Sequence, residues 1–214
     1  MTPGPFARHE GLAAPLWRPD VDTDVIVPSR EITGPERDGY GEKLFAPWRY
    51  LEGRRENPDF VLNREPFRRA TVLVAGPNFG CGSSREMAAW AVRQFGFRVV
   101  IAPSFGAIFR ANLLRNGVLP ATLPPGVAEA LADRAQAGDL VIVADLRDMA
   151  IAAPGGERHA FALGERERLR LLEGLDEIGL TLREAGAMAA WRERDREARP
   201  WAWREGDGAP PPAT

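Results

Sequence analysis

Residues 70–102, ATVLVAGPNFGCGSSREMAAWAVRQFGFRVVIA, decide the fold of this chain. The apolar, β-branched run 71–75 is typical of a buried strand, and 97–102 is a second run of the same kind. Between the two runs, residues 84–95 have the apolar spacing of a helix, and Gly96 follows as its C-terminal cap. Strand, helix and strand predict a βαβ unit with a right-handed crossover.

Other elements are expected around this unit. The patterns predict helices at 104–116, 127–137 and 166–174, and strands at 118–123, 139–145, 147–152 and 159–163. Residues 29–58 are rich in Gly, Pro and charge, and are expected to form a long ordered loop with one helical turn. We therefore predict an α/β fold with a parallel βαβ core and antiparallel additions.

The two ends of the chain differ from its centre. Residues 1–8 are expected to be frayed, and 16–28 show a short apolar–polar alternation. Near the other end, Thr181-Leu182-Arg183-Glu184 has the form of a capping box that opens a helix running to about Arg196. Residues 206–214 are rich in Gly, Pro and Ala and are predicted to be disordered. We expect one domain, 1–205, followed by this tail.

Composition narrows the class of protein. The 214 residues carry 28 basic and 30 acidic side chains, a net charge of −2, so neither nucleic acid nor membrane is an expected partner. Cys81 is the single cysteine, which excludes a disulfide framework and favours a reducing cytoplasm. Residues 1–20 contain no apolar segment typical of a secretory leader, and no apolar run has the length of a membrane span.

The turn 80–86, Gly-Cys-Gly-Ser-Ser-Arg-Glu, joins the first strand to the helix. Its simplest interpretation is a capping box with Ser83 as N-cap and Glu86 three positions later. Arg85 argues for more, because a cation in the first helical turn costs about 0.3–1 kcal/mol against the helix dipole. A bound anion reverses that sign, so the turn predicts a site for a carboxylate or a phosphate.

Common phosphate and hydrolase motifs do not fit this turn. A dinucleotide fingerprint requires glycine where Arg85 stands, and a Walker A loop requires a lysine that is absent from the turn. A serine-hydrolase elbow reads Gly-x-Ser-x-Gly, and His9 and His159 are the two histidines that the sequence offers as a base. Nucleotide binding and serine hydrolysis are therefore not favoured.

The turn resembles the Gly-Ser-Ser-Arg-Glu motif in the swivelling β/β/α domain of the aconitase superfamily. Further blocks agree in order and spacing, namely 21–28 (VDTDVIVP), 41–50, 59–63 (DFVLN), 97–105, 116–120 and 176–182. Over about residues 12–203 the chain is similar to the family of bacterial 3-isopropylmalate dehydratase small subunits. That family converts 2-isopropylmalate to 3-isopropylmalate in leucine biosynthesis, by dehydration followed by rehydration.

The resemblance implies roles for particular residues. Ser83 is expected to be the catalytic base, while Arg85 and Ser84 bind a substrate carboxylate. Thr23 and Asp24 are expected to lie beside the site and either orient the substrate or support residues that contact it; pairing with local backbone at a strand end is the alternative for them. Arg30 stands in the loop that sets substrate choice in relatives, and is a candidate to bind a carboxylate; an ordinary surface position is the alternative for it.

The resemblance also implies a partner. Members of the family work with a [4Fe–4S] cluster, which needs several cysteine thiolates, whereas this chain has Cys81 alone and no other expected metal ligand. We therefore expect no cofactor on this chain and a cluster on a large subunit, in a heterodimer that acts on a small hydroxy-dicarboxylate.

The chain departs from the family pattern at two places. Met87 and Ala89 stand where relatives have His and often Pro, and 29–32 reads Ser-Arg-Glu-Ile where many have an aromatic residue followed by Leu. These departures leave two alternatives open. One is a related hydro-lyase subunit for another hydroxy-acid, of the methylmalate or citraconate type, and the other is a catalytically silent binding subunit.

Overall fold

The computed structural model describes residues 4–32, 34, 37–83 and 85–203. The chain divides into two compact units, Met1–Gly174 and Leu175–Thr214, which are described separately below. No helix in the described ranges is both long enough and apolar enough to cross a membrane.

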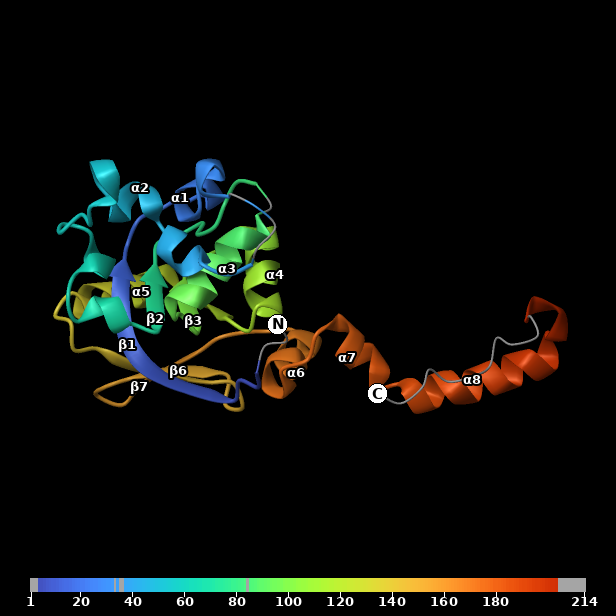
Figure 1. Ribbon diagram of the computed structural model, residues 1–214. Helices are drawn as coiled ribbons and strands as arrows, with labels where there is room; N and C mark the ends of the chain where they lie inside the picture. Colours follow the sequence, from blue (N-terminus) through green and yellow to red (C-terminus); the bar gives the residue numbers. More distant parts are fainter. Residues whose placement is uncertain (1–3, 33, 35–36, 84, 204–214) are drawn as a thin grey trace. The chain divides into compact units, whose positions relative to one another are not determined.

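A seven-stranded mixed sheet organises the first unit, with strand order β4-β3-β2-β1-β5-β6-β7 (Figure 1). Four neighbouring strands are parallel, β1 (Arg8–Leu16), β2 (Val72–Ala75), β3 (Val99–Ala102) and β4 (Leu119–Thr122). Three further strands extend the sheet antiparallel from β1, namely β5 (Val141–Asp145), β6 (Ala150–Ala153) and β7 (Glu157–Ala160). The predicted α/β fold with a parallel core and antiparallel additions is confirmed.

Apolar cores cover both faces of this sheet. Leu73 and Val100 pack into one core together with α3 (Glu86–Phe95). Their neighbours Val72 and Val99 pack into the other with α5 (Pro125–Ala135), as the two-residue period of a strand requires. Two further helices, α4 (Ala107–Arg115) and α6 (Glu165–Glu173), also contribute residues to these cores. Strands buried on both faces explain why the runs 71–75 and 97–102 are apolar throughout.

Strand β1 differs from the sequence prediction. Residues up to 8 were expected to be frayed, yet Phe6 is buried and β1 begins at Arg8. The first part of β1 pairs antiparallel with β5, and its last part, residues 13–16, pairs parallel with β2. The central strand of the sheet therefore joins its parallel and antiparallel halves, and glycine, alanine and proline in it hide the usual strand pattern.

The segment between β1 and β2 has more structure than the single helical turn expected for 29–58. It contains α2 (Ala46–Arg49) and a series of 3-10 turns at Ser29–Glu31, Tyr40–Lys43, Glu52–Arg54, Val61–Asn63 and Phe67–Arg69. Aromatic packing supports it, because the rings of Phe45 and Trp48 stack with centroids 5.7 Å apart. The segment is ordered by its own contacts, although little of it is regular secondary structure.

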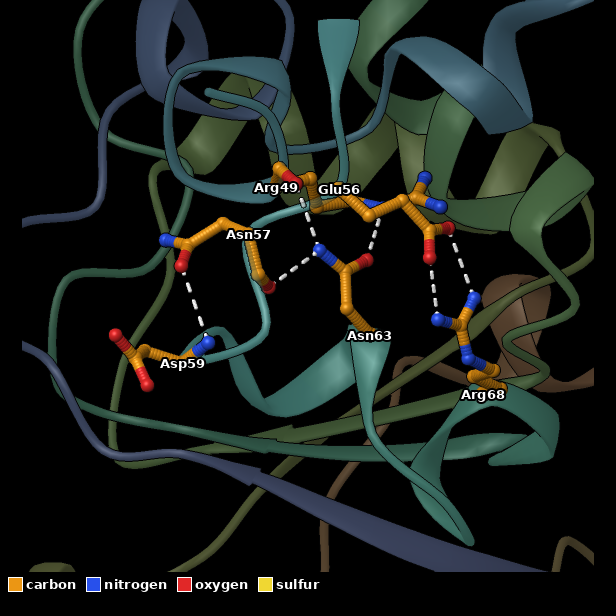
Figure 2. A network of polar contacts seen from close by, with 6 residues as sticks. All are labelled: Arg49, Glu56, Asn57, Asp59, Asn63 and Arg68. Carbon is orange, nitrogen blue, oxygen red and sulfur yellow. Dashed lines mark hydrogen bonds and ion pairs between the residues drawn. The ribbon is translucent and has the colours of Figure 1, made fainter.

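A buried polar network fastens this segment (Figure 2). The guanidinium of Arg49 donates to Asn63 Oδ1 at 3.2 Å and to the Gly41 carbonyl at 3.0 Å. Asn63 Nδ2 in turn donates to the carbonyls of Arg49 and Asn57, at 2.6 and 2.9 Å. At the exposed side of the same network, Arg68 pairs with Glu56 through both guanidinium nitrogens. The buried groups are satisfied by one another, as their desolvation requires.

The second unit contains α7 (Glu177–Leu182) and α8 (Ala185–Ala198). The helix predicted to run to about Arg196 corresponds to α8, but the capping box predicted to open it at Thr181 is wrong. The N-cap of α8 is Glu184, which makes no side-chain cap, and Thr181 lies inside α7, where it donates to the Glu177 carbonyl. Asp176 is the N-cap of α7, with its carboxylate accepting from Gly179 N–H at 2.7 Å. The predicted tail, 206–214, lies outside the described residues, and the single-domain boundary at 205 stays a prediction.

Candidate functional site

Three loops meet at the carboxyl ends of β1, β2 and β3, the edge of a parallel sheet where ligands commonly bind. The backbone of Asp22 forms an isolated parallel β-bridge with that of Cys81, and Phe79 forms another with Phe105. Gly80 N–H donates to the Val21 carbonyl at 2.7 Å, and Thr23 N–H donates to the Cys81 carbonyl at 3.0 Å. The turn predicted from the sequence is therefore tied on both sides to neighbouring loops.

Gly80 is required by its backbone. Its φ of +72° lies in the left-handed region, and a Cβ at this position would collide with the ring of Phe109 on α4. The glycine thus lets the turn lie directly on α4, which places the residues that follow it.

Thr23 and Ser83 are brought together by this arrangement. Thr23 is the first residue of the short helix α1 (Thr23–Ile26), whose N-cap is Asp22, and it is 1% exposed. Its Oγ1 lies 3.0 Å from the Ser83 carbonyl oxygen and 3.2 Å from Ser83 Oγ. Ser83 itself is an exposed residue, so the hydrogen bond joins its hydroxyl to a buried threonine.

The capping box predicted at Ser83 is wrong. Helix α3 begins at Glu86, and its N-cap is Arg85, which has an extended backbone and makes no side-chain cap. Ser83 lies two residues before that cap, and Thr23 engages its carbonyl and hydroxyl oxygens. Among the described residues, no side chain caps the N-terminus of α3, and the free N–H groups of a helix start favour an anion. Ser84 lies outside the described residues.

Arg85 pairs with Asp24, 61 residues away in the sequence. The same guanidinium nitrogen donates to the Val27 carbonyl at 3.3 Å. Arg85 therefore stands just outside the helix rather than in its first turn, and Asp24 balances its charge. The predicted cost of placing Arg85 in the first turn, against the helix dipole, therefore does not apply. The pairing of Arg85 with Asp24 joins two predicted site residues, and their spacing in the sequence did not indicate it.

Arg30 stands apart from these contacts. It lies on the exposed 3-10 turn Ser29–Glu31. Its neighbour Glu31 is ion-paired with Arg54 at 2.8 Å, whereas no contact among the described residues joins Arg30 to Thr23, Ser83 or Arg85. Four of the predicted site residues, Thr23, Asp24, Ser83 and Arg85, therefore form one contact group and Arg30 does not join it.

Cys81 has an environment that disfavours its thiolate. Burial raises the pKa of the Cys81 thiol, and the nearby carboxylates of Asp20 and Asp22 raise that pKa further. Within the described part of the chain, no three His, Cys, Asp or Glu side chains are grouped so as to hold a metal ion. The thiol next to the turn is accordingly neutral at physiological pH.

Asn78 is a site-supporting residue that sequence reasoning missed. Its backbone φ is +57°, its N–H donates to Ser104 Oγ at 2.8 Å, and its Nδ2 donates to Asp20 Oδ1 at 2.7 Å. One asparagine thus connects the loops after β1, β2 and β3. The Pro77-Asn78 pair was the available signal, because asparagine tolerates left-handed backbone better than most residues.

Comparison with known proteins agrees with this architecture. The model of the aconitase C-terminal domain matches residues 4–126. The 3-isopropylmalate dehydratase small subunit of Cupriavidus necator is 50% identical over 92% of this chain and 97% of its own length, and that of Mesorhizobium japonicum is 46% identical over 92% and 98%. A crystal structure of 3-isopropylmalate dehydratase from Methanocaldococcus jannaschii superposes with a TM-score of 0.62 at 27% identity, covering 85% of this chain and 98% of that one.

Proposed function

Because this chain belongs to the family of 3-isopropylmalate dehydratase small subunits, a hydro-lyase family with the aconitase-type fold, we propose that its turn 80–86 supplies one half of the active site. The reaction is the isomerisation of 2-isopropylmalate to 3-isopropylmalate in leucine biosynthesis. The observation that carries the proposal is the contact between Thr23 and the hydroxyl of Ser83, an exposed residue, beside Arg85 and the start of α3, which no side chain in the described ranges caps.

A substrate carboxylate is best accommodated by Arg85 and the N-terminus of α3. Guanidinium groups bind carboxylates through two parallel hydrogen bonds, and free helix N–H groups favour the same negative charge. Asp24 holds the Arg85 guanidinium in place and balances its positive charge until a substrate carboxylate binds. Ser84 is proposed as a further donor to that carboxylate, and Arg30 is a proposed contact for the substrate's second carboxylate.

Ser83 is proposed as the base. Its Oγ takes the proton from the carbon beside a carboxylate, and the electron pair left behind forms the C=C bond as hydroxide leaves the neighbouring carbon. Returning a proton and hydroxide to the exchanged carbons gives the isomer. Serine is a weak acid, so the chain must stabilise the Ser83 alkoxide before this step.

Thr23 offers a specific means of doing so. It has one hydroxyl proton and two acceptors within reach, the carbonyl oxygen and the Oγ of Ser83. While Ser83 is neutral, its own hydroxyl can donate to Thr23 Oγ1, and Thr23 can donate to the carbonyl. When Ser83 is ionised, the Thr23 hydroxyl can rotate and donate to the alkoxide, at no cost in protein rearrangement.

The leaving hydroxyl needs a Lewis acid that this chain is not equipped to hold. A [4Fe–4S] cluster needs several thiolates, whereas the sequence has one cysteine and the environment of Cys81 keeps its thiol neutral. The residues present do not fit the cluster. We therefore propose that the large subunit implied by the name of the relatives carries it, and that the complex is a cytoplasmic heterodimer.

Relatives favour isopropylmalate over the other candidate hydroxy-acids, and their names do not favour a silent binding subunit. Met87, which stands where the family has His, is half-buried and packs against the apolar core. Its side chain is used in packing, so the departure does not by itself indicate a different substrate.

Turnover by the assembled complex tests the proposal. The chain is produced with the large subunit of a close relative, and isopropylmalate isomerisation is measured for wild type, Ser83→Ala and Thr181→Ala. Removal of a base is expected to lower kcat by about 10²–10⁴-fold, with the α7 variant unchanged. Wild-type activity in Ser83→Ala would exclude Ser83 as base, and turnover of methylmalate but not isopropylmalate by wild type would overturn the substrate.

A further inference from the structure

A second polar cluster lies at the opposite ends of the same strands. It comprises His9 on β1, Thr71 just before β2, Arg98 just before β3, and Arg93 in the last turn of α3. The turn 80–86 follows the carboxyl end of β2, and β2 is four residues long, so about 13 Å of strand separates the two regions. The cluster is therefore outside the site proposed above.

His9 has a fixed place in this cluster. Its Nε2 lies 2.8 Å from Thr71 Oγ1, and its ring faces that of Phe6 with centroids 6.2 Å apart. Gly11 makes the contact possible, because a Cβ at this position would collide with Thr71 Oγ1 and approach His9 Nε2 to 2.9 Å. The His9–Thr71 pair is thus built into the sheet rather than free on its surface.

Arg98 has a less satisfied environment. Its guanidinium carbon lies 5.6 Å from the centroid of Phe6, and its Nε is buried without a hydrogen-bond partner. A buried donor left unpaired costs about 1–3 kcal/mol. Neither Arg98 nor Arg93 forms an ion pair with any carboxylate of the described residues.

The three basic groups also oppose one another. Burial lowers the pKa of His9, Arg93 and Arg98, and the neighbouring arginines lower that of His9 further, as Arg93 does for Arg98. No carboxylate contributes to these pKa values in the opposite direction. The dipole of α3 favours a cation at Arg93, but it does not account for Arg98 or for the unpaired Nε.

We propose that Arg93, Arg98 and protonated His9 bind a small oxyanion at this end of the sheet. An anion carrying several acceptor oxygens would pair with these basic groups and relieve the repulsion among the three. The anion would also favour protonation of His9, because a protonated imidazole donates hydrogen bonds from both ring nitrogens, whereas a neutral one donates from only one. Phosphate, with up to two charges near neutral pH, matches a site of two guanidinium groups and one imidazolium.

The imidazole of His9 is the natural probe, because the chain has two histidines, His9 and His159. We would follow both rings by nitrogen-15 NMR in the full chain, titrating pH in phosphate and in chloride at equal ionic strength. Phosphate is expected to raise the pKa of His9 by about half a unit or more, while His159 is unaffected, because a ligand that prefers the protonated form shifts the equilibrium toward it.

Substitutions separate the proposed site from general screening. Arg98→Gln should raise the pKa of His9 in chloride, since a neighbouring cation is gone, and should also abolish the phosphate effect. Arg93→Gln serves as a second variant should Arg98→Gln fail to fold. Arg8→Gln is the matched control, because Arg8 is adjacent in sequence but exposed and paired with Glu10.

An unchanged His9 pKa in phosphate would overturn the proposal, as would an equal phosphate response in Arg8→Gln, Arg93→Gln and Arg98→Gln. A third result would also overturn it: no response to phosphate, but a raised pKa of His9 on adding the large subunit. That outcome would assign the cluster to a carboxylate of the partner protein instead of a free oxyanion.

Discussion

The hydroxyl oxygens of Thr23 and Ser83 lie 3.2 Å apart although 60 residues separate them in the chain. Thr23 is buried beneath an exposed serine, and its position is fixed by the backbone bond from its N–H to the Cys81 carbonyl. Charge that develops on Ser83 Oγ therefore meets a donor whose place is already set. This relationship makes Thr23 the most informative residue to change.

Thr23→Val removes the hydroxyl while keeping the shape of the side chain. In the complex with the large subunit, kcat is expected to fall by about 10²-fold with KM nearly constant, because the donor stabilises the alkoxide that Ser83 must form before it takes the proton and does not bind the substrate. Thr23→Ser keeps the donor and should retain most of the activity. A Val variant that matches wild type in kcat would remove Thr23 from the mechanism.

Arg85→Lys tests recognition of the substrate carboxylate. Lysine keeps the charge but loses the two-pronged geometry, so KM should rise by about tenfold or more. Arg30→Lys tests the other proposed carboxylate contact, an exposed arginine with no hydrogen bond or ion pair to the Thr23–Ser83–Arg85 group, and its effect on KM is expected to be smaller. Equal effects of the two variants would mean that both arginines bind substrate, and no effect of either would contradict the assignment of Arg85.

Cys81 is predicted to react slowly with thiol reagents. Burial, followed by the charges of Asp20 and Asp22, raises its pKa, so the thiolate fraction at pH 7.5 is below that of a free cysteine. Alkylation by iodoacetamide should be slower than for N-acetylcysteine. The rate should rise with pH, and its midpoint should lie at a higher pH than that of N-acetylcysteine. Asp20→Asn should accelerate the reaction, whereas Asp59→Asn should leave it unchanged.

The network in Figure 2 predicts that loss of the buried Arg49 lowers stability more than loss of the exposed Arg68. Arg49→Met leaves Asn63 Oδ1 and the Gly41 carbonyl without their donor, which should lower the free energy of unfolding by about 2–4 kcal/mol. Arg68→Met removes the exposed pair with Glu56 and should change stability little. Urea unfolding of both variants measures the contrast, and equal losses would mean that burial does not decide it.

Stability should depend on pH through His9. Its folded pKa lies below the ordinary value of 6.5, so the unfolded chain binds the proton more readily. The contribution of His9 is present above about pH 6.5 and is lost as pH falls toward the folded pKa. In chloride buffer, His9→Gln should flatten the pH dependence of the free energy of unfolding in this range, and His159→Gln should not. If the slope is preserved in His9→Gln, then groups other than His9 cause the pH dependence.

Local patterns predicted the centre of the fold well. The apolar runs at 71–75 and 97–102, with a helical period between them, correspond to β2, α3 and β3 within a few residues. The parallel core and antiparallel additions followed from the order of these elements. Strand β1 was missed, because its last four residues are two alanines, a proline and a leucine rather than the β-branched and aromatic residues typical of strands.

The site was predictable by residue type but not by contact. The capping box at Ser83 failed because a distant hydroxyl, that of Thr23, engages Ser83, and helix α3 then starts at Glu86. The pairing of Arg85 with Asp24 spans 61 residues, and the link from Asn78 to Asp20 spans 58. Contacts of this kind depend on the register of three loops, which spacing along the sequence does not encode.

The hydrogen bond between His9 and Thr71 occupies the volume that any side chain at position 11 would need. A Cβ at position 11 would lie 1.8 Å from Thr71 Oγ1, so any replacement of Gly11 forces the Thr71 or His9 side chain to shift and disturbs their hydrogen bond. A residue other than glycine is therefore accommodated more easily where Thr71 has been exchanged for a smaller residue. Positions 9, 11 and 71 should consequently vary together among descendants of this sequence, as a single inherited unit.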